Sequence, residues 1–361
     1  MSLQLLDKLA EGGGLSHAEY VELLQARSPA LAEELFARAR RVRDRIYGPQ
    51  VFLRGLVELT SYCRNDCYYC GLRRSNRNAE RYRLTPEQIL ASCEVGYRLG
   101  FRTFVLQGGE DEYFIDERVV ALVRSVKASC PGSAVTLSLG EKPYESYRQL
   151  REAGAERYLL RHETADPEHY RKLHPENLTL ENRLRCLHDL RSLGFQTGAG
   201  FIVGSPGQTL DCLAKDLAFL ADFKPEMIGI GPFMPHHDTP FAQAPAGDLD
   251  LTLFLLGVIR LLLPTVLLPA TTALGSIHPR GRELGVLAGA NVIMPNLSPP
   301  DVRDKYSIYD NKLSSGAEAA EGLEDLRRRL AEINCRIAPG RGDHPNFAQP
   351  DETTAASSKK M

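Results

Sequence analysis

Hydrophobic and polar positions follow a helical period near the start of the chain and change to short apolar runs after residue 50. Within residues 16–48, Ser16 and Glu19 have the spacing of a capping box, which predicts the start of a helix. Thr85 and Gln88 repeat that pattern further along. Eight apolar runs rich in β-forming residues alternate with helical stretches, at residues 55–60, 102–107, 134–139, 157–162, 197–203, 227–233, 267–273 and 291–295.

This alternation of eight strands with helices is the count of a (β/α)8 barrel. The runs are mostly apolar, as expected for parallel strands that are covered on both faces. We therefore predict an α/β fold of the TIM-barrel type over residues 51–335, with an N-terminal helical extension over residues 1–50. Residues 336–361 are predicted to be a C-terminal tail with a disordered polar end. A doubly wound open sheet is the alternative fold.

The most apolar stretch, residues 251–275, predicts a buried helix that leads into a buried strand. As a membrane span it would place Arg260 and Pro264 near mid-bilayer, where an arginine costs roughly 2.5–3.5 kcal/mol. The N-terminal segment lacks the pattern of a signal peptide, so we expect a cytoplasmic protein without membrane contact. The net charge of −2 also gives no general attraction to nucleic acid.

Three of the eight cysteines form a C-x3-C-x2-C cluster after the first predicted strand: Cys63, Cys67 and Cys70. The other five are scattered singly and are expected to be buried, reduced thiols. Thiolates suit zinc or iron–sulfur clusters, and no fourth ligand lies close in the sequence. We interpret the loop as the site of a [4Fe–4S] cluster with one iron open to another ligand. Zinc with a remote ligand, or three unrelated thiols, remain as alternatives.

The cysteine pattern C-x3-C-x-aromatic-C resembles the radical S-adenosylmethionine (SAM) superfamily. Further segments resemble the HydE family of [FeFe]-hydrogenase maturases within it, and together they span residues 50 to about 310. These segments are "CGLRRSNRNAERYRLTPEQI", "LQGGEDEYF", "VTLSLGE", "RYLLRHETADPEHYRKL", "GAGFIVGSPGQT", "IGIGPFMPHHDTP", "LLPATTALG" and "GANVIMPNLSP". The resemblance implies that the open iron binds the methionine part of SAM and that one electron cleaves SAM to a 5′-deoxyadenosyl radical.

The resemblance also implies which residues hold the cofactor. The aromatic residue in the cluster motif would contact adenine, and the "GGE" motif would receive the methionine amino group, which fits a carboxylate beside two glycines. The alternative role of the aromatic residue is ordinary packing, and that of the glycines is a tight turn. For Arg183 the alternative is an ion pair on a helix surface. The expected cofactor residues are Tyr69, Gln107, Gly108, Gly109, Glu110, Glu163 and Arg183. The adjacent His236 and His237 are interpreted as loop residues without a metal.

Arg157 and Arg161 have the same parity on one predicted strand, so both are expected to face into the barrel. Buried guanidinium groups need carboxylates or an anionic ligand. We predict a receptor for a small molecule with carboxylate or cyanide groups, and an internal Arg–Glu network is the alternative. The expected substrate residues are Thr136, Ser138, Arg157, Arg161, Thr271, Thr272 and Tyr306.

The resemblance implies a cysteine-bound Fe(CO)2(CN) unit as substrate in assembly of the hydrogenase H-cluster, with the other hydrogenase maturases as partners. Some HydE proteins carry a second cluster, but Cys335 is the only cysteine after residue 212, so we expect a single cluster. The arginine-rich residues 73–83 are hypothesised to dock an acidic electron donor such as flavodoxin or ferredoxin. The alternatives are a methylornithine synthase-like mutase and a non-catalytic iron–sulfur carrier or scaffold.

Overall fold

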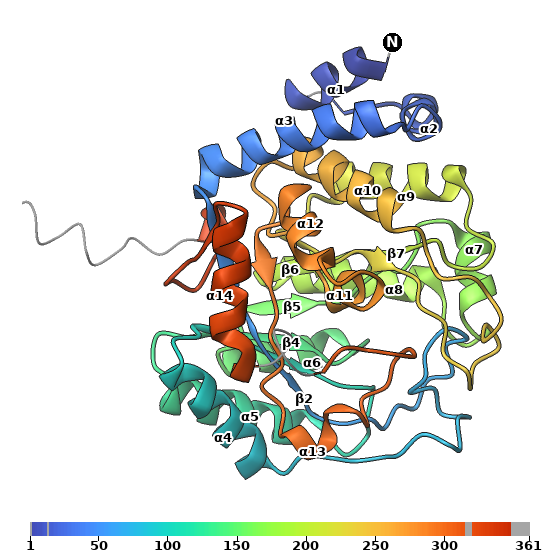
Figure 1. Ribbon diagram of the computed structural model, residues 1–361. Helices are drawn as coiled ribbons and strands as arrows, with labels where there is room; N and C mark the ends of the chain where they lie inside the picture. The colour runs from blue at the N-terminus through green and yellow to red at the C-terminus, as the bar shows by residue number, and fades with distance from the viewer. Residues whose placement is uncertain (1, 13, 315–319, 348–361) are drawn as a thin grey trace, which may run out of the picture.

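A ring of parallel strands forms the centre of the fold in the computed structural model, which describes residues 2–12, 14–314 and 320–347 (Figure 1). Six of the strands form one sheet in the order β2-β3-β4-β5-β6-β8, and each pairing in it is parallel. These strands are β2 (Gly55–Glu58), β3 (Thr103–Gln107), β4 (Ala134–Ser138), β5 (Arg157–Leu159), β6 (Gln196–Ala199) and β8 (Met227–Ile228).

Two further segments close this sheet into a barrel. Met227 of β8 bridges to Leu267, and the residues just after Leu267 bridge to β10 (Val292–Ile293). Beyond β10, Asn296 bridges to β2 and completes the ring. The predicted (β/α)8 barrel is therefore confirmed, although the apolar run around Leu267 contributes isolated bridges and no extended strand.

Helices follow the strands along the chain and cover the outside of the barrel (Figure 1). The predicted capping box of Thr85 and Gln88 is present at the start of α4. The short strands β7 (Ile202–Val203) and β9 (Gly231–Pro232) pair with each other beyond the ends of β6 and β8. The helices are α4 (Pro86–Arg98), α5 (Asp116–Ser129), α6 (Tyr144–Glu152), α7 (Pro167–Leu173), α8 (Leu180–Ser192), α9 (Leu210–Phe223), α10 (Leu249–Leu262), α11 (Thr272–Ile277), α12 (Gly281–Leu287) and α13 (Pro300–Arg303).

Three helices precede the barrel and pack across α9 and α10, at the top of Figure 1. They are α1 (Ser2–Ala10), α2 (His17–Gln25) and α3 (Pro29–Tyr47). The predicted capping box of Ser16 and Glu19 starts α2, with both of its reciprocal hydrogen bonds in place. A short strand that the sequence pattern did not predict, β1 (Gln50–Leu53), follows α3 and pairs with β10.

The C-terminal part of the described chain returns to the barrel. After a short 3-10 turn at Ala320–Gly322, α14 (Leu323–Glu332) leads to β11 (Arg336–Ile337), which pairs with β1. Residues 336–347, predicted to be part of a tail, therefore belong to the fold, and they end in a second 3-10 turn at Pro345–Phe347. The disorder predicted for the polar end concerns residues 348–361, which lie outside the described residues.

The apolar stretch at residues 251–275 forms α10 and the segment that leads to α11. Arg260 on α10 is fully buried, and its guanidinium donates to the carbonyl of Gly289 at 2.8 Å and to Oδ1 of Asn291 at 3.0 Å. Within the described part of the chain, no helix is both long enough and apolar enough to cross a bilayer.

Candidate active site

The three clustered cysteines lie on the long loop between β2 and α4, at the carboxyl end of the barrel strands. Backbone amides of this loop dock it on three separate segments: Arg64 N donates to the Glu110 carbonyl, Tyr68 N to the Leu173 carbonyl and Gly71 N to the Ile308 carbonyl, each at 2.9 Å. The Arg81 guanidinium ties the loop together from within, since it donates to the carbonyls of Ser61, Leu72, Arg73 and Asn76. Arg81 therefore holds the shape of the loop from the inside.

The thiols of this loop fit an iron–sulfur group. All three are free and partly buried. Burial raises the pKa of Cys63 and Cys67 and brings that of Cys70 to about 12, so each thiolate needs a cationic group beside it. The charges of Cys70 and Cys63 both raise the pKa of Cys67, so the three thiols lie near one another. Three neighbouring thiolates from one loop are the donor set of a [4Fe–4S] cluster with one open iron.

Gly108 and Gly109 follow β3 and allow the next strand end to approach the cysteine loop. A Cβ atom on Gly109 would lie 2.1 Å from the carbonyl oxygen of Tyr62 and 2.7 Å from Cβ of Cys63. The backbone amide of Glu110 then donates to Sγ of Cys63 at 3.4 Å. Only glycine fits at position 109, which accounts for the motif in physical terms.

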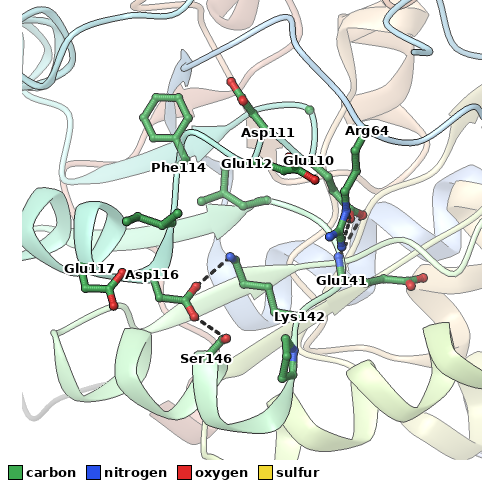
Figure 2. A pocket seen from close by; sticks show the side chains of 14 residues that line it. Arg64, Glu110, Asp111, Glu112, Phe114, Asp116, Glu117, Glu141, Lys142 and Ser146 are labelled. Carbon is green, nitrogen blue, oxygen red and sulfur yellow. Dashed lines mark hydrogen bonds and ion pairs between the residues drawn. The ribbon is translucent and has the colours of Figure 1, made fainter. Parts of the chain in front are cut away.

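The Glu110 carboxylate is held from two sides. Arg64 donates to its Oε2 at 3.0 Å, and the backbone amide of Glu141 donates to its Oε1 at 3.0 Å. A cavity of about 350 Å³ lies beside Glu110 and is also lined by Glu141 (Figure 2). On its far wall Lys142 and Asp116 form an ion pair at 2.9 Å. Two carboxylates of the site thus border one cavity at the mouth of the barrel.

Glu163 follows β5 in a strained conformation, with a φ of 65°. Its backbone amide donates to the Gly200 carbonyl at 3.0 Å, and its carbonyl accepts from the amide of Ile202 at 3.1 Å. These two hydrogen bonds hold the residue in the strained conformation. Its Oε2 is buried and lies 3.3 Å from Nη2 of Arg161, yet it accepts no hydrogen bond from the described residues. A strained residue with an unsatisfied carboxylate oxygen is a candidate ligand-binding group.

Charges from the surrounding elements reach the thiols. Burial and the neighbouring Cys70 raise the pKa of Cys67 most. The Arg183 guanidinium lowers this pKa, and the Glu163 carboxylate raises it. Glu110 likewise raises the pKa of Cys63, in addition to burial. The predicted cofactor residues Glu110, Glu163 and Arg183 are therefore gathered around the cysteines.

Tyr69, the aromatic residue of the motif, packs against His174 in an edge-on contact with ring centres 5.4 Å apart. Burial lowers the pKa of His174 to about 3, so this imidazole is neutral. Its Nδ1 donates to the carbonyl of Tyr170 at 3.0 Å, and its Nε2 accepts from the Tyr69 hydroxyl at 3.3 Å. The Tyr69 side chain is thus held in one orientation at the site.

The predicted substrate residues are spread along the barrel. Ser138 is in register with Gln107 near the mouth, and Nε2 of Gln107 donates to the hydroxyl of buried Tyr306 at 3.4 Å. Thr136 lies two residues before Ser138 on the same strand and therefore deeper in the barrel. Its Oγ1 is buried without a hydrogen-bond partner among the described residues. Thr271 precedes α11, where its hydroxyl donates to the Ile230 carbonyl at 3.4 Å, and Thr272 is the first residue of that helix.

Arg157 and Arg161 do not face the same region, contrary to the expectation from their parity. β5 ends at Leu159, so the strand alternation does not continue to Arg161. Arg157 is fully buried near the amino ends of the strands, where it donates to Oγ1 of Thr103 at 3.2 Å and to Oδ1 of Asp343 at 2.8 Å. This arrangement matches the alternative of an internal ion-pair network.

A buried ion pair near the mouth was missed from the sequence. Oε1 of Glu58, the last residue of β2, lies 2.7 Å from Nζ of Lys312, which also sits 5.2 Å from the ring centre of Tyr306. Burial raises the pKa of Glu58. Sequence patterns gave no signal for this pair because Lys312 belongs to an irregular segment.

His236 and His237 form hydrogen bonds that hold their loop. Nδ1 of His237 lies 2.7 Å from Oδ1 of Asp310, which ties the loop to the segment after α13. Nδ1 of His236 accepts from the amide of Asp238 at 3.1 Å, so its hydrogen is on Nε2, the nitrogen that faces Asp310 at 3.9 Å. One ring nitrogen of each histidine and one Asp310 oxygen lie within 4.8 Å of one another, a spacing that could hold a metal ion, so the interpretation as loop residues without a metal stays a prediction.

Comparisons with known proteins place this geometry among iron–sulfur enzymes. The family model for the radical SAM superfamily matches residues 57–220. The [FeFe] hydrogenase maturase subunit HydE of Thermotoga maritima is 46% identical over 310 residues, which cover 86% of this chain and 88% of that protein. The 3-methylornithine synthase of Methanosarcina barkeri is 30% identical over 90% of this chain and 91% of that protein.

Solved structures support the same fold. The crystal structure of methylornithine synthase (PylB) is similar with a TM-score of 0.82 and 30% identity, over 92% of this chain and 97% of that one. The hydrogenase maturase HydG is similar with a TM-score of 0.80 over 99% of this chain and 80% of that one, at 20% identity, and so supports the fold alone.

Proposed function

This chain belongs to the HydE family of radical SAM enzymes, and we propose that it acts in assembling the active-site cluster of [FeFe] hydrogenase. The observation that carries this proposal is the identity of 46% to a HydE maturase over 86% of the chain, with the three-cysteine loop at the mouth of the barrel. The enzyme uses one [4Fe–4S] cluster and SAM, as its family does.

Cys63, Cys67 and Cys70 would hold the cluster as thiolates and leave one iron open. When bound, this group supplies the electron that cleaves SAM reductively to methionine and a 5′-deoxyadenosyl radical. The chain itself positions SAM: we propose that Glu110 binds the methionine ammonium and Arg183 the carboxylate. Glu163 would accept from the ribose hydroxyls, a role supported by its unsatisfied Oε2.

The proposed substrate is a small ligand inside the barrel, a cysteine-bound Fe(CO)2(CN) unit. We propose that a substrate carboxylate would share the Arg161 guanidinium with Oε2 of Glu163, which lies 3.3 Å from it. The buried hydroxyl of Thr136 has no hydrogen-bond partner in the described residues. Ser138, Thr271, Thr272 and Tyr306 offer further hydroxyls, whereas Arg157 already has a carboxylate partner in Asp343.

An acidic flavodoxin or ferredoxin is the proposed electron donor, and the cytoplasm, where thiols stay reduced, the proposed compartment. Only some of the arginines at residues 73–83 are available for docking. Arg73 pairs with Asp66 at 2.9 Å, Arg81 binds loop carbonyls and Arg83 makes a bidentate pair with Asp111 at 2.7 and 2.9 Å. Arg74 and Arg77 are exposed and remain for charge pairing with a donor, whereas the exposed Arg83 is already paired.

Two other functions compete with this proposal. A methylornithine synthase-like mutase is favoured by the 30% identity and the TM-score of 0.82 to PylB. A carrier or scaffold would bind the iron–sulfur group without cleaving SAM.

A cell-free hydrogenase maturation assay with every other component present tests the proposal. It compares no addition, this protein and its Cys70→Ala variant, with 5′-deoxyadenosine measured in parallel. We expect hydrogenase activity and 5′-deoxyadenosine only with the intact protein. Deoxyadenosine without hydrogenase activity would discard the maturase function in favour of a mutase, and neither product from a reconstituted sample would favour a carrier.

A further inference from the structure

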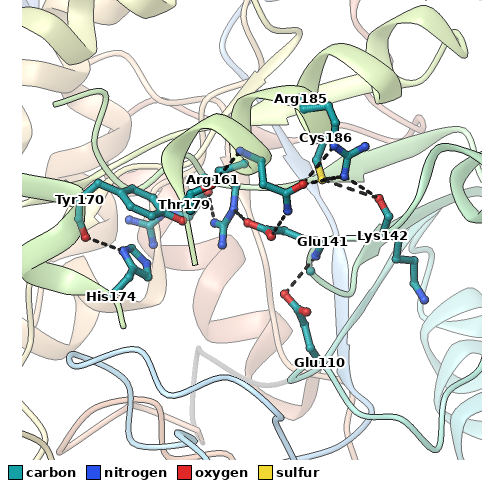
Figure 3. A network of polar contacts seen from close by, with 12 residues as sticks. Glu110, Glu141, Lys142, Arg161, Tyr170, His174, Thr179, Arg185 and Cys186 are labelled. Atoms are coloured by element: carbon teal, nitrogen blue, oxygen red, sulfur yellow. Dashed lines mark hydrogen bonds and ion pairs between the residues drawn. The ribbon is translucent and has the colours of Figure 1, made fainter. Parts of the chain in front are cut away.

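Glu141 lies three residues after β4 and joins two of the proposed SAM-binding residues. Its carboxylate accepts from Nε of Arg183 at 2.5 Å, and its backbone amide donates to Oε1 of Glu110 at 3.0 Å (Figure 3). Only 9% of the residue is exposed. One buried residue therefore contacts a cationic and an anionic group of the site.

The second oxygen of Glu141 is also satisfied. Oε2 accepts from Nδ2 of Asn182 at 2.6 Å, so the carboxylate bridges two consecutive residues of α8. Nη1 of Arg183 donates to the carbonyl of Arg161 at 2.6 Å. These bonds fix the plane of the Arg183 guanidinium with Nε and Nη1, and Nη2 takes part in neither of them.

The turn before Glu141 brings its amide to Glu110. Gly140 has a φ of 77°, and a Cβ atom there would lie 2.1 Å from Oε1 of Glu110. A side chain at position 140 would displace the Glu110 carboxylate. The Gly140–Glu141 pair therefore keeps Glu110 and Arg183 at a fixed separation across the site.

The methionine part of SAM carries an ammonium and a carboxylate on one carbon. Binding both at once needs an anion and a cation at matching distance, and rigid partners lose less entropy on binding than mobile ones. On the basis of the proposed function, we propose that Glu141 is a positioning residue that holds Arg183 and Glu110 in the geometry that receives the amino-acid end of SAM.

The test is the SAM dependence of the electron paramagnetic resonance spectrum of the reduced, cluster-loaded protein. SAM binding at the open iron changes this spectrum, and the SAM concentration for half of the change measures affinity. Glu141→Gln keeps the size of the side chain but removes its charge. It also replaces one acceptor oxygen by an NH2 donor, which cannot accept from both Asn182 and Arg183 as the carboxylate does. We expect the half-saturating SAM concentration to rise at least tenfold, while iron content and the 5′-deoxyadenosine rate at saturating SAM stay within threefold of wild type.

Glu145→Gln is the matched control, since Glu145 on α6 is exposed and pairs with Arg148 and Gln149 on its own helix. It should leave SAM affinity unchanged. A second comparison uses the Arg183→Ala background, where Glu141→Gln should change half-saturation less than twofold if Glu141 acts through Arg183.

Each outcome decides the inference. Wild-type affinity in Glu141→Gln, an equal loss in Glu145→Gln, or an additive loss in the Arg183→Ala background would overturn it. A wild-type protein whose spectrum does not respond to SAM would instead overturn the proposed function.

Discussion

At the scale of single residues, the site is built from positions whose side chains or backbone have little freedom. Gly109 lies against the backbone of Tyr62, and Glu163 is held with a positive φ. The sequence could predict the cysteines, because their spacing is a direct consequence of binding one group from one loop. It could also place Glu110 and Arg183 at the site, but not their common partner Glu141, since that contact depends on how two strand ends and a helix meet.

Substituting Gly109 tests this close approach. We expect Gly109→Ala to push the loop away from β3, because its Cβ would lie 2.1 Å from the Tyr62 carbonyl. The iron content after reconstitution should fall at least several-fold while the protein remains folded by circular dichroism. Gly229→Ala, where a Cβ meets nothing within 4 Å, is the control. Equal iron content in both variants would contradict this account of the motif.

At the scale of elements, the C-terminal segment closes the amino end of the barrel. Sequence patterns assigned it to a tail, because residues 336–347 are too short and polar to show a period. Its role depends on an ion pair between Arg157 and Asp343, which are 186 positions apart in the chain. The prediction of a strand at residues 157–162 was correct in type but too long. Arg161 lies beyond the end of β5, so the expectation that it faces the same way as Arg157 was wrong.

The pair predicts a pH effect on stability. Burial alone would raise the pKa of Asp343, but Arg157 and the other hydrogen-bond donors around it lower that pKa from 3.8 to about 2. The carboxylate therefore stabilises the fold fully above pH 3.8, and this stabilisation, about 2 kcal/mol, is lost as the pH falls toward 2.

Asp343→Asn should lower the free energy of unfolding at pH 7 by about 3 kcal/mol, because it leaves the Arg157 guanidinium buried without a counter-charge. Denaturant titration measures the loss. Asp189→Asn, which removes an ion pair with Arg185 on one helix, should cost less than about 0.5 kcal/mol. If the two variants lose the same stability, the C-terminal segment does not close the barrel as described.

At the scale of the whole molecule, eight apolar runs in order were enough to predict the barrel, since parallel strands buried on both faces leave a strong pattern. The closure at Leu267 and Asn296 rests on single bridges, which no local pattern encodes. The surface at residues 73–83 was predicted less well, because three of its five arginines are already engaged: Arg73 and Arg81 are half-buried in the loop, and the exposed Arg83 pairs with Asp111.

The exposed pair Arg74 and Arg77 predicts how the electron donor docks. Replacing both by serine should slow cluster reduction by flavodoxin several-fold at low salt, and the difference should vanish at about 0.5 M salt, where charges are screened. Stopped-flow absorbance measures the rate. Serine at Arg41 and Arg45, exposed on α3, makes the same change in net charge away from the loop. An equal effect of both double variants would exclude docking at the cysteine loop.

The central claim is that the cysteine loop holds a single four-iron cluster with one iron open to SAM. Mössbauer spectroscopy of the full chain, reconstituted with iron-57 under anaerobic conditions, tests it most directly when spectra with and without SAM are compared. The account predicts about four irons per chain, with one in four changing its isomer shift when SAM is added. A spectrum that SAM leaves unchanged, or iron equivalent to two clusters, would contradict it.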